Sequence, residues 1–172
     1  MSLFHILRDL AQQQNGQQAT RAPKPTGQQQ ALRVVSIRFQ SGGGFGCSVY
    51  CFAEIQVRPG SVTLLERPWR EKQQQNPQKY RDLRVDADLS DKHWQELQQL
   101  VDHDALIALP DVIPCHCTGD EGSETLEVTF SDHSRKSVSY TGAPREIAAL
   151  TEKLLALLTK LERELPPNWR NQ

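Results

Sequence analysis

The sequence predicts an α+β fold in which an antiparallel sheet of about five to six strands is covered on one face by two main helices. The first observation is that short segments with alternating apolar and polar residues recur between residues 33 and 140. The second is that residues 91–102 and 144–165 space their apolar side chains by three and four, as amphipathic helices do. Strands with one apolar face need amphipathic helices to cover that face.

Residues 33–66 predict an antiparallel meander of three strands. The segment RVVSIRFQ (33–40) alternates, the glycine-rich SGGGFG (41–46) follows, and CSVYCFAEIQV (47–57) alternates again. The turn RPGS (58–61) leads into a third short strand, VTLLE (62–66). The residues expected on the apolar face are Val35, Ile37 and Phe39 in the first strand and Val49, Cys51, Ala53, Ile55 and Val57 in the second.

The next stretch predicts an exposed loop, an edge strand and a helix. Residues 67–79 are polar and bracketed by prolines, which is typical of a loop, and 80–89 can add a strand at the edge of the sheet. Ser90 is the expected N-cap of a helix that runs to about Asp102, with Trp94, Leu97, Leu100 and Val101 on its apolar side. Residues 104–114 are expected to be an irregular connection.

The last part predicts a hairpin and a helix. Residues 124–130 and 136–140 form the two strands, and Pro144 marks the first turn of the helix. Its apolar positions are Ile147, Leu150, Leu154, Leu157, Leu158, Leu161 and Leu165. We expect this stripe to cover the sheet, and a dimer seam is the alternative.

The predicted organisation has four parts. Residues 1–11 form a short helix, and residues 12–32 form a linker rich in Gln and Pro. Residues 33–165 form a single α+β domain, and residues 166–172 form a C-terminal tail.

The composition bounds the class of protein. The chain has 172 residues, of which 37% are hydrophobic, which suits one domain with a modest core. It shows neither a secretory signal nor the roughly 18 apolar residues of a membrane span, so we expect a cytoplasmic protein, a monomer or weak homodimer, with no membrane partner. In that compartment the four cysteines are expected to be reduced thiols or metal ligands.

Charge is distributed unevenly along the chain. Residues 85–132 contain one Lys against twelve Asp and Glu, a net charge of −11. Such a segment favours a basic protein partner, and a concrete version is an immunity-type inhibitor that neutralises a bacterial toxin. The candidate contact acids are Asp86, Asp88, Asp91, Asp102, Asp104, Asp111, Asp120, Glu121 and Glu124. The alternative is that these acids are dispersed in space and neutralised by the basic flanks.

The segment PCHCTGDEGSE (114–124) raises the possibility of a metal site. Zinc prefers four thiolate or imidazole ligands, and the candidates are Cys115, Cys117, Cys47 and His133. An extended chain between Cys47 and Cys51 would place their Cα atoms about 13 Å apart, too far for one zinc ion. We therefore expect a turn without a cofactor, and the alternative function is a zinc-dependent or thiol-dependent site at Cys115 and Cys117.

Other chemistries lack their motifs. The glycine-rich segment 41–46 has no Lys-Ser/Thr pair and precedes a strand, unlike a phosphate-binding loop. The sequence has no nucleophile elbow and no aromatic–basic strand motif for nucleic acid. The sequence therefore favours a non-catalytic protein-binding domain that does not bind nucleic acid.

The order of the segments GGGFG, SVYCFAEIQV, CHCTGDEG and LEVTF resembles that of a group of small bacterial α+β domains. These share a Gly-rich turn, a Cys-x-(x)-Cys turn followed by acid and Gly, and a Leu-rich terminal helix. The resemblance covers about residues 33–160 and implies the same fold, but no established activity.

Overall fold

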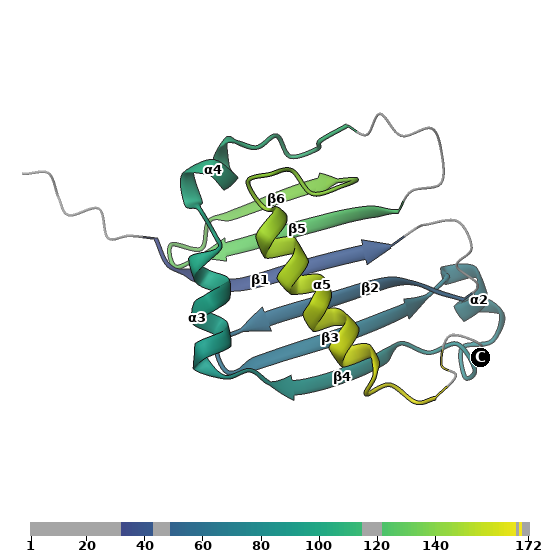
Figure 1. The fold of residues 1–172 in the computed structure, drawn as a ribbon. Helices are drawn as coiled ribbons and strands as arrows, with labels where there is room; N and C mark the ends of the chain where they lie inside the picture. The colour runs from purple at the N-terminus through teal and green to yellow at the C-terminus, as the bar shows by residue number, and fades with distance from the viewer. Residues whose placement is uncertain (1–31, 43–48, 115–121, 168, 170–172) are drawn as a thin grey trace, which may run out of the picture. The chain divides into compact units, whose positions relative to one another are not determined.

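The computed structural model describes residues 32–42, 49–114, 122–167 and 169, which belong to one compact unit, Leu32–Gln172. The predicted helix 1–11 and residues 12–31 of the predicted linker lie outside the described residues. The expected α+β class is confirmed by a six-stranded antiparallel sheet with helices packed beside it (Figure 1).

The strand order in the sheet is β4-β3-β2-β1-β5-β6, and all neighbours are antiparallel. The strands are β1 (Val34–Gly42), β2 (Tyr50–Arg58), β3 (Ser61–Pro68), β4 (Leu83–Asp88), β5 (Ser123–Phe130) and β6 (Arg135–Tyr140). The predicted meander and the edge strand at 80–89 are therefore confirmed. Strand β1 becomes central because β5 pairs with its free side after 80 residues of intervening chain.

One position of the predicted apolar face differs. Val35 is exposed and Val34 is buried, because the pairing of β1 with β5 shifts by one residue between Val34 and Ser36. Such a bulge reverses the side on which the preceding side chain lies. Beyond it, Ile37 and Phe39 are fully buried, as predicted.

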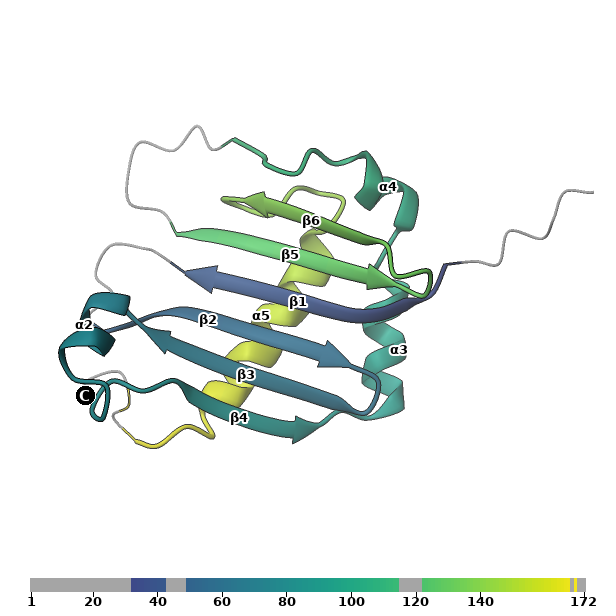
Figure 2. The same ribbon diagram turned by 180° about the vertical axis from the view of Figure 1, so that it is seen from behind.

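Helix α5 (Ala148–Glu162) lies diagonally across one face of the sheet, and no other described helix crosses the opposite face (Figures 1 and 2). Its buried side chains are Leu150, Thr151, Leu154, Leu158 and Leu161. They pack on the apolar positions of the strands, which include Phe39, Ile55, Leu64, Leu126 and Val138. The prediction that the terminal helix covers the sheet is confirmed.

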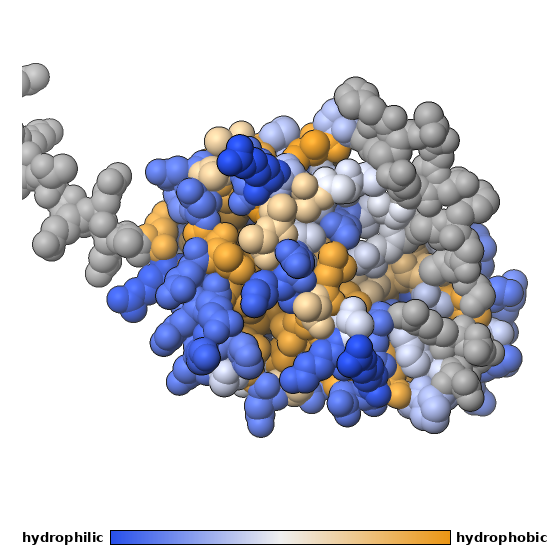
Figure 3. Space-filling view, viewed as in Figure 1, coloured by the Kyte–Doolittle hydropathy of each residue, from blue (hydrophilic) through white to orange (hydrophobic). Residues whose placement is uncertain are grey.

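Helix α3 (Asp91–Gln99) lies at the end of the sheet and begins as the sequence predicts. The Ser90 side chain accepts a hydrogen bond from the backbone N–H of His93, which satisfies one of the free donors of the first turn. Trp94 and Leu97 are its buried residues. Figure 3 shows apolar surface between α3 and α5 with hydrophilic side chains around it.

Two segments predicted to be irregular contain short helices. Residues 70–75 form α2 (Arg70–Gln75), which buries no side chain, and residues 103–108 form α4 (His103–Ala108). The helix N-cap of α4 is Asp102, whose carboxylate accepts from the N–H of Ala105 at 3.0 Å. The sequence interpretation placed the end of the preceding helix at this residue, whereas the structure starts a new helix there.

Both ends of the terminal helix differ from the prediction. Pro144 opens a turn, in which the N–H of Ile147 donates to the Pro144 carbonyl, and α5 begins only at Ala148. The segment predicted as a tail includes Trp169, which is buried and contacts the ring of Tyr50 edge-on at 5.5 Å between centroids. The core therefore extends past residue 165.

The two outer strands have different surroundings. Residues 111–113 run along β6, where Ser139 donates to the carbonyl of Asp111 and accepts from the N–H of Ile113, each at 2.8 Å. No strand of the described residues pairs with the outer side of β4, whose exposed side chains are Arg84, Asp86 and Asp88. None of the described helices has the length and apolar character needed to cross a membrane.

Candidate functional site

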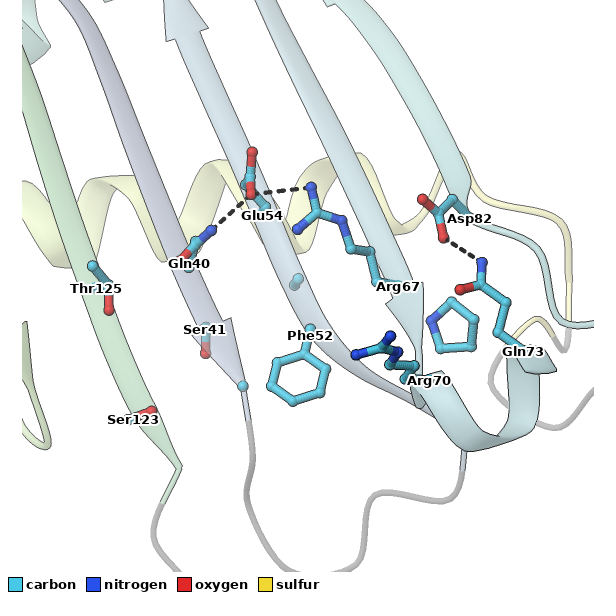
Figure 4. A pocket seen from close by; sticks show the side chains of 13 residues that line it. Gln40, Ser41, Phe52, Glu54, Arg67, Arg70, Gln73, Asp82, Ser123 and Thr125 are labelled. Carbon is cyan, nitrogen blue, oxygen red and sulfur yellow. Dashed lines mark hydrogen bonds and ion pairs between the residues drawn. The ribbon is translucent and has the colours of Figure 1, made fainter.

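A groove of about 450 Å³ lies on the face of the sheet opposite α5, beside α2 (Figure 4). We call it the open-face groove. Strand alternation explains its floor, because residues next to the buried positions of each strand point to the other face. The register then sets Gln40 of β1 directly opposite Glu54 of β2 and Thr125 of β5. The described residues that line the groove are Gln40, Ser41, Gly42, Phe52, Ala53, Glu54, Arg67, Pro68, Arg70, Gln73, Asp82, Ser123 and Thr125.

Glu54 is the centre of a polar network on this floor. Its Oε2 accepts a hydrogen bond from Gln40 Nε2 at 2.8 Å and lies 3.5 Å from Arg67 Nη2. Its Oε1 lies 3.6 Å from Nε of Arg38, which also reaches Glu127 at 3.7 Å. The side chain of Glu54 is 16% exposed, whereas those of Arg38 and Arg67 are 40% and 47% exposed. The carboxylate is therefore shielded, and both arginine side chains are more exposed than it is.

Phe52 lines the groove, and it contacts Trp69, which lies between the lining residues Pro68 and Arg70 in the sequence. Phe52 and Trp69 contact each other edge to face, with 5.1 Å between ring centroids and an interplanar angle of 86°. They are 42% and 38% exposed, although both are large apolar residues. The backbone N–H of Trp69 donates a hydrogen bond to the backbone carbonyl of Val49 at 2.9 Å. Exposed aromatic pairs of this kind are typical of contact surfaces.

The position of Phe52 depends on a glycine in the neighbouring strand. A Cβ atom on Gly42 would lie 2.5 Å from the carbonyl oxygen of Cys51 and 2.7 Å from Cδ1 of Phe52. Only glycine allows β1 and the Phe52 ring to approach so closely. The glycine at the end of β1 is therefore part of the groove's construction.

The wall beside α2 carries both a paired and an unpaired set of polar groups. Gln73 Nε2 donates to Asp82 Oδ1 at 3.1 Å, which ties α2 to the segment before β4. Figure 4 shows the Arg70 side chain pointing toward Phe52. Among the described residues, no carboxylate forms an ion pair with Arg70. The lining includes no His or Cys among these residues, so the groove offers charge, hydrogen bonds and aromatic surface.

A second polar cluster lies on the covered face of the sheet. The hydroxyls of Tyr140 and Thr151 share a hydrogen bond of 2.8 Å between β6 and α5. Burial raises the pKa of Tyr140 to about 12, and it also raises the pKa of Glu124, which forms a hydrogen bond with Tyr140. Because Tyr140 belongs to the sheet and Thr151 to the helix, this cluster joins two layers of the fold.

The acids predicted to bind a partner are spread along the border of the sheet. Asp86 and Asp88 lie on edge strand β4, and Asp91 begins α3. Asp102 and Asp104 lie at α4, Asp111 lies beside the opposite edge strand β6, and Glu124 lies half-buried on the covered face. The strands β4 and β6 are five strand spacings apart, about 24 Å. Asp120 and Glu121 lie outside the described residues.

Several of these acids already have partners within the domain. Asp86 accepts two hydrogen bonds from Arg84 at 2.8 Å and one from Thr63 at 2.6 Å. Asp102 caps α4, and Asp111 forms an ion pair with Lys136 at 2.7 Å. The described acids therefore do not form one contiguous surface.

Of the predicted metal ligands, Cys47, Cys115 and Cys117 lie outside the described residues. His133 lies in the β5–β6 turn, with a φ of 68°, at the end of β5 farthest from Ser123. Within the part of the chain that the structure describes, no three His, Cys, Asp or Glu side chains gather to hold a metal ion.

The expectation of reduced thiols is wrong for Cys51. This residue is buried on β2 and forms a disulfide, and its partner cysteine lies outside the described residues. Disulfide connectivity depends on which chain segments meet in the folded domain, so the sequence alone could not assign it.

Sequence reasoning also missed the open-face groove. One signal was present, because the predicted alternation of residues 47–57 puts Phe52 on the polar side of the strand. An aromatic residue on such a face is a candidate for binding. Comparison with protein families, with curated proteins and with solved structures finds no match for the chain.

Proposed function

We propose that the chain is a non-catalytic protein-binding domain and that the open-face groove is its binding surface. The observation that carries the proposal is the exposed pair Phe52 and Trp69 beside the arginines of the groove. Protein interfaces are enriched in aromatic and arginine side chains, and the few residues that carry most of the binding energy are often Trp, Tyr or Arg. The glycine that makes room for Phe52 supports the same role, because a side chain at Gly42 would overlap the ring where it now lies.

The arrangement of charges changes the kind of partner that the sequence favours. An inhibitor that neutralises a basic toxin would need its acids on one surface, and the described acids are divided between opposite borders of the sheet. We therefore place the proposed binding surface at the groove and not at the acids of residues 85–132. A role as an inhibitor of another protein remains compatible with the groove as the contact surface.

The disulfide bears on where the protein works. Disulfides persist in oxidising compartments and are uncommon in the cytoplasm. The bond at Cys51 thus favours an oxidising compartment over the predicted cytoplasmic location. The test is a count of reactive thiols in protein isolated without reductant from its own cells, where Cys51 is expected to resist alkylation.

The binding proposal is tested by affinity capture with the full chain. We expect wild-type protein to retain a partner that Phe52→Ala and Trp69→Ala variants lose. Val112→Ala is the matched control, because Val112 is 67% exposed and lies beside β6, away from the groove. Thermal unfolding of each variant separates loss of contact from loss of fold. Equal capture by the folded groove variants and the control would contradict the proposal.

A further inference from the structure

We infer that the open-face groove binds an acidic segment of a protein partner, in which a carboxylate pairs with Arg70 while a neighbouring apolar side chain packs on Phe52 and Trp69. This inference rests on the proposed function and names the chemistry of the partner. It differs from the basic partner that the sequence favours.

The acids that line the groove already have partners within the domain, and Asp82 on its wall accepts a hydrogen bond from Gln73. Glu54 interacts with Gln40 through a hydrogen bond and with two arginines through ion pairs of 3.5–3.6 Å. A basic side chain entering the groove would have to displace these arginines or lie against their exposed ends. The floor therefore disfavours a cation from a partner.

The arginines of the groove keep hydrogen-bond donors that no carboxylate of the described residues occupies. Arg67 reaches Glu54 through one Nη atom, so most of its N–H groups point elsewhere, and its side chain is 47% exposed. Arg70 has no carboxylate partner among the described residues and points toward Phe52. A guanidinium binds a carboxylate through two parallel hydrogen bonds, which is the strongest contact it can make.

The size of the groove and its aromatic residues favour a protein segment over a small anion as the ligand. The groove has a volume of about 450 Å³, far more than one carboxylate fills. The pair of Phe52 and Trp69 has no use in binding a free anion, but it fits an apolar side chain next to the acid. The combination of free arginine and exposed aromatic pair thus matches an Asp or Glu beside an aromatic or aliphatic residue.

The experiment is a selection of peptides from a random twelve-residue phage library on the immobilised full chain. Displayed peptides have no free C-terminus, so an acidic preference reports on side chains. We expect the selected sequences to be enriched in Asp or Glu next to an aromatic or aliphatic residue. An amidated synthetic peptide of the selected sequence is then titrated by fluorescence anisotropy against wild type and variants.

We expect Arg70→Ala to raise the Kd for this peptide by about tenfold or more, because a charge-assisted hydrogen-bonded pair is lost. Arg135→Ala is the control, since Arg135 is an exposed arginine on β6, outside the lining of the groove. In the reciprocal test, Arg70→Glu binds the peptide whose acid is replaced by Lys better than it binds the original. Recovery by this charge exchange requires direct pairing and does not follow from a structural role of Arg70.

The outcomes separate this inference from the proposed function. One outcome is that neutral or basic peptides bind wild type and Arg70→Ala equally but do not bind Phe52→Ala. This outcome would overturn the acidic partner but leave the groove as a binding surface. Competition by sodium acetate or phosphate alone at the peptide's own concentration would also overturn it, because the site would then be one for free anions. If no selected peptide depends on Phe52 or Arg70, both proposals fail.

Discussion

The hydrogen bond between Tyr140 and Thr151 offers a quantitative test of how α5 is attached to the sheet. Both residues are buried, and their hydroxyl oxygens lie 2.8 Å apart. In Tyr140→Phe the ring still fills its place, but Thr151 keeps a buried hydroxyl without this partner. An unsatisfied buried group costs about 1–3 kcal/mol. The backbone carbonyl of Ile147, one turn earlier in the chain, can accept a hydrogen bond from the threonine hydroxyl. We therefore expect Tyr140→Phe to lower the free energy of unfolding by about 1–2 kcal/mol.

The assay is urea unfolding followed by circular dichroism, with the slope of the transition unchanged between variants. Thr151→Val removes the other hydroxyl at nearly constant shape, and the double variant removes both. We expect the double variant to lose less free energy of unfolding than the sum of the single variants, with a coupling of about 1 kcal/mol. The contact between Tyr140 and Glu124 affects the Tyr140 variants with and without Thr151 equally, so it cancels in the cycle. Losses that add to within about 0.3 kcal/mol would refute the claim that the two hydroxyls interact.

Three further predictions use the same unfolding assay. Leu154→Ala, on the fully buried side of α5, is expected to lower the free energy of unfolding by about 2–5 kcal/mol. Leu157 is half-buried, so Leu157→Ala is expected to lower it clearly less. Equal losses would mean that another side of the helix faces the sheet. Burial raises the pKa of Glu124, so folding favours the protonated carboxyl, and the free energy of unfolding falls as the pH rises through that raised pKa. Glu124→Gln is expected to reduce this fall and to be more stable than wild type at neutral pH. Parallel pH profiles of the free energy of unfolding for the two proteins would count against this prediction. Gly42→Ala is expected to destabilise the protein more than Gly60→Ala, because a Cβ at Gly42 overlaps a backbone carbonyl. At Gly60, which has a φ of 78°, the Cβ meets open space, and alanine costs about 1 kcal/mol of conformational strain. The reverse order of stability would contradict the close packing of β1 on Phe52.

The strands and the covering helices could be predicted because burial leaves a periodic trace in the sequence. The alternation of residues 50–58 and the spacing of the leucines in α5 each match the face that the structure buries. Ser90 was equally readable, since an N-cap is a local device that needs only the next three residues. Where local chemistry and burial agree, a single sequence is sufficient.

The segments that were misread lack that trace. Helix α2 consists of Arg, Glu, Lys and Gln, which favour helix, but it buries nothing and so has no apolar stripe. Pro144 is a common first helical residue, yet it is equally suited to a turn. Trp169 lies beyond two prolines in a short polar segment, and the Tyr50 ring that it contacts belongs to a strand far away in the sequence.

The open-face groove could be predicted only in part. The polar side of each strand was evident, but the neighbours across the sheet were not, because β1 pairs with β5 from a distant part of the chain. Gln40 therefore meets both Glu54 and Thr125 for reasons of topology. The described acids of residues 85–132 are separated for the same reason, since residues close in sequence are carried to opposite edges of the sheet.

The borders of the sheet have a consequence for self-association. The unpaired backbone of an outer strand is a template on which other chains can add in β-aggregates. Residues 111–113 occupy that position along β6, and the charged side chains of Arg84, Asp86 and Asp88 make β4 a poor template. We therefore expect the protein to stay dispersed at high concentration, and substitution of Asp86 by Val is the change most suited to starting fibre growth.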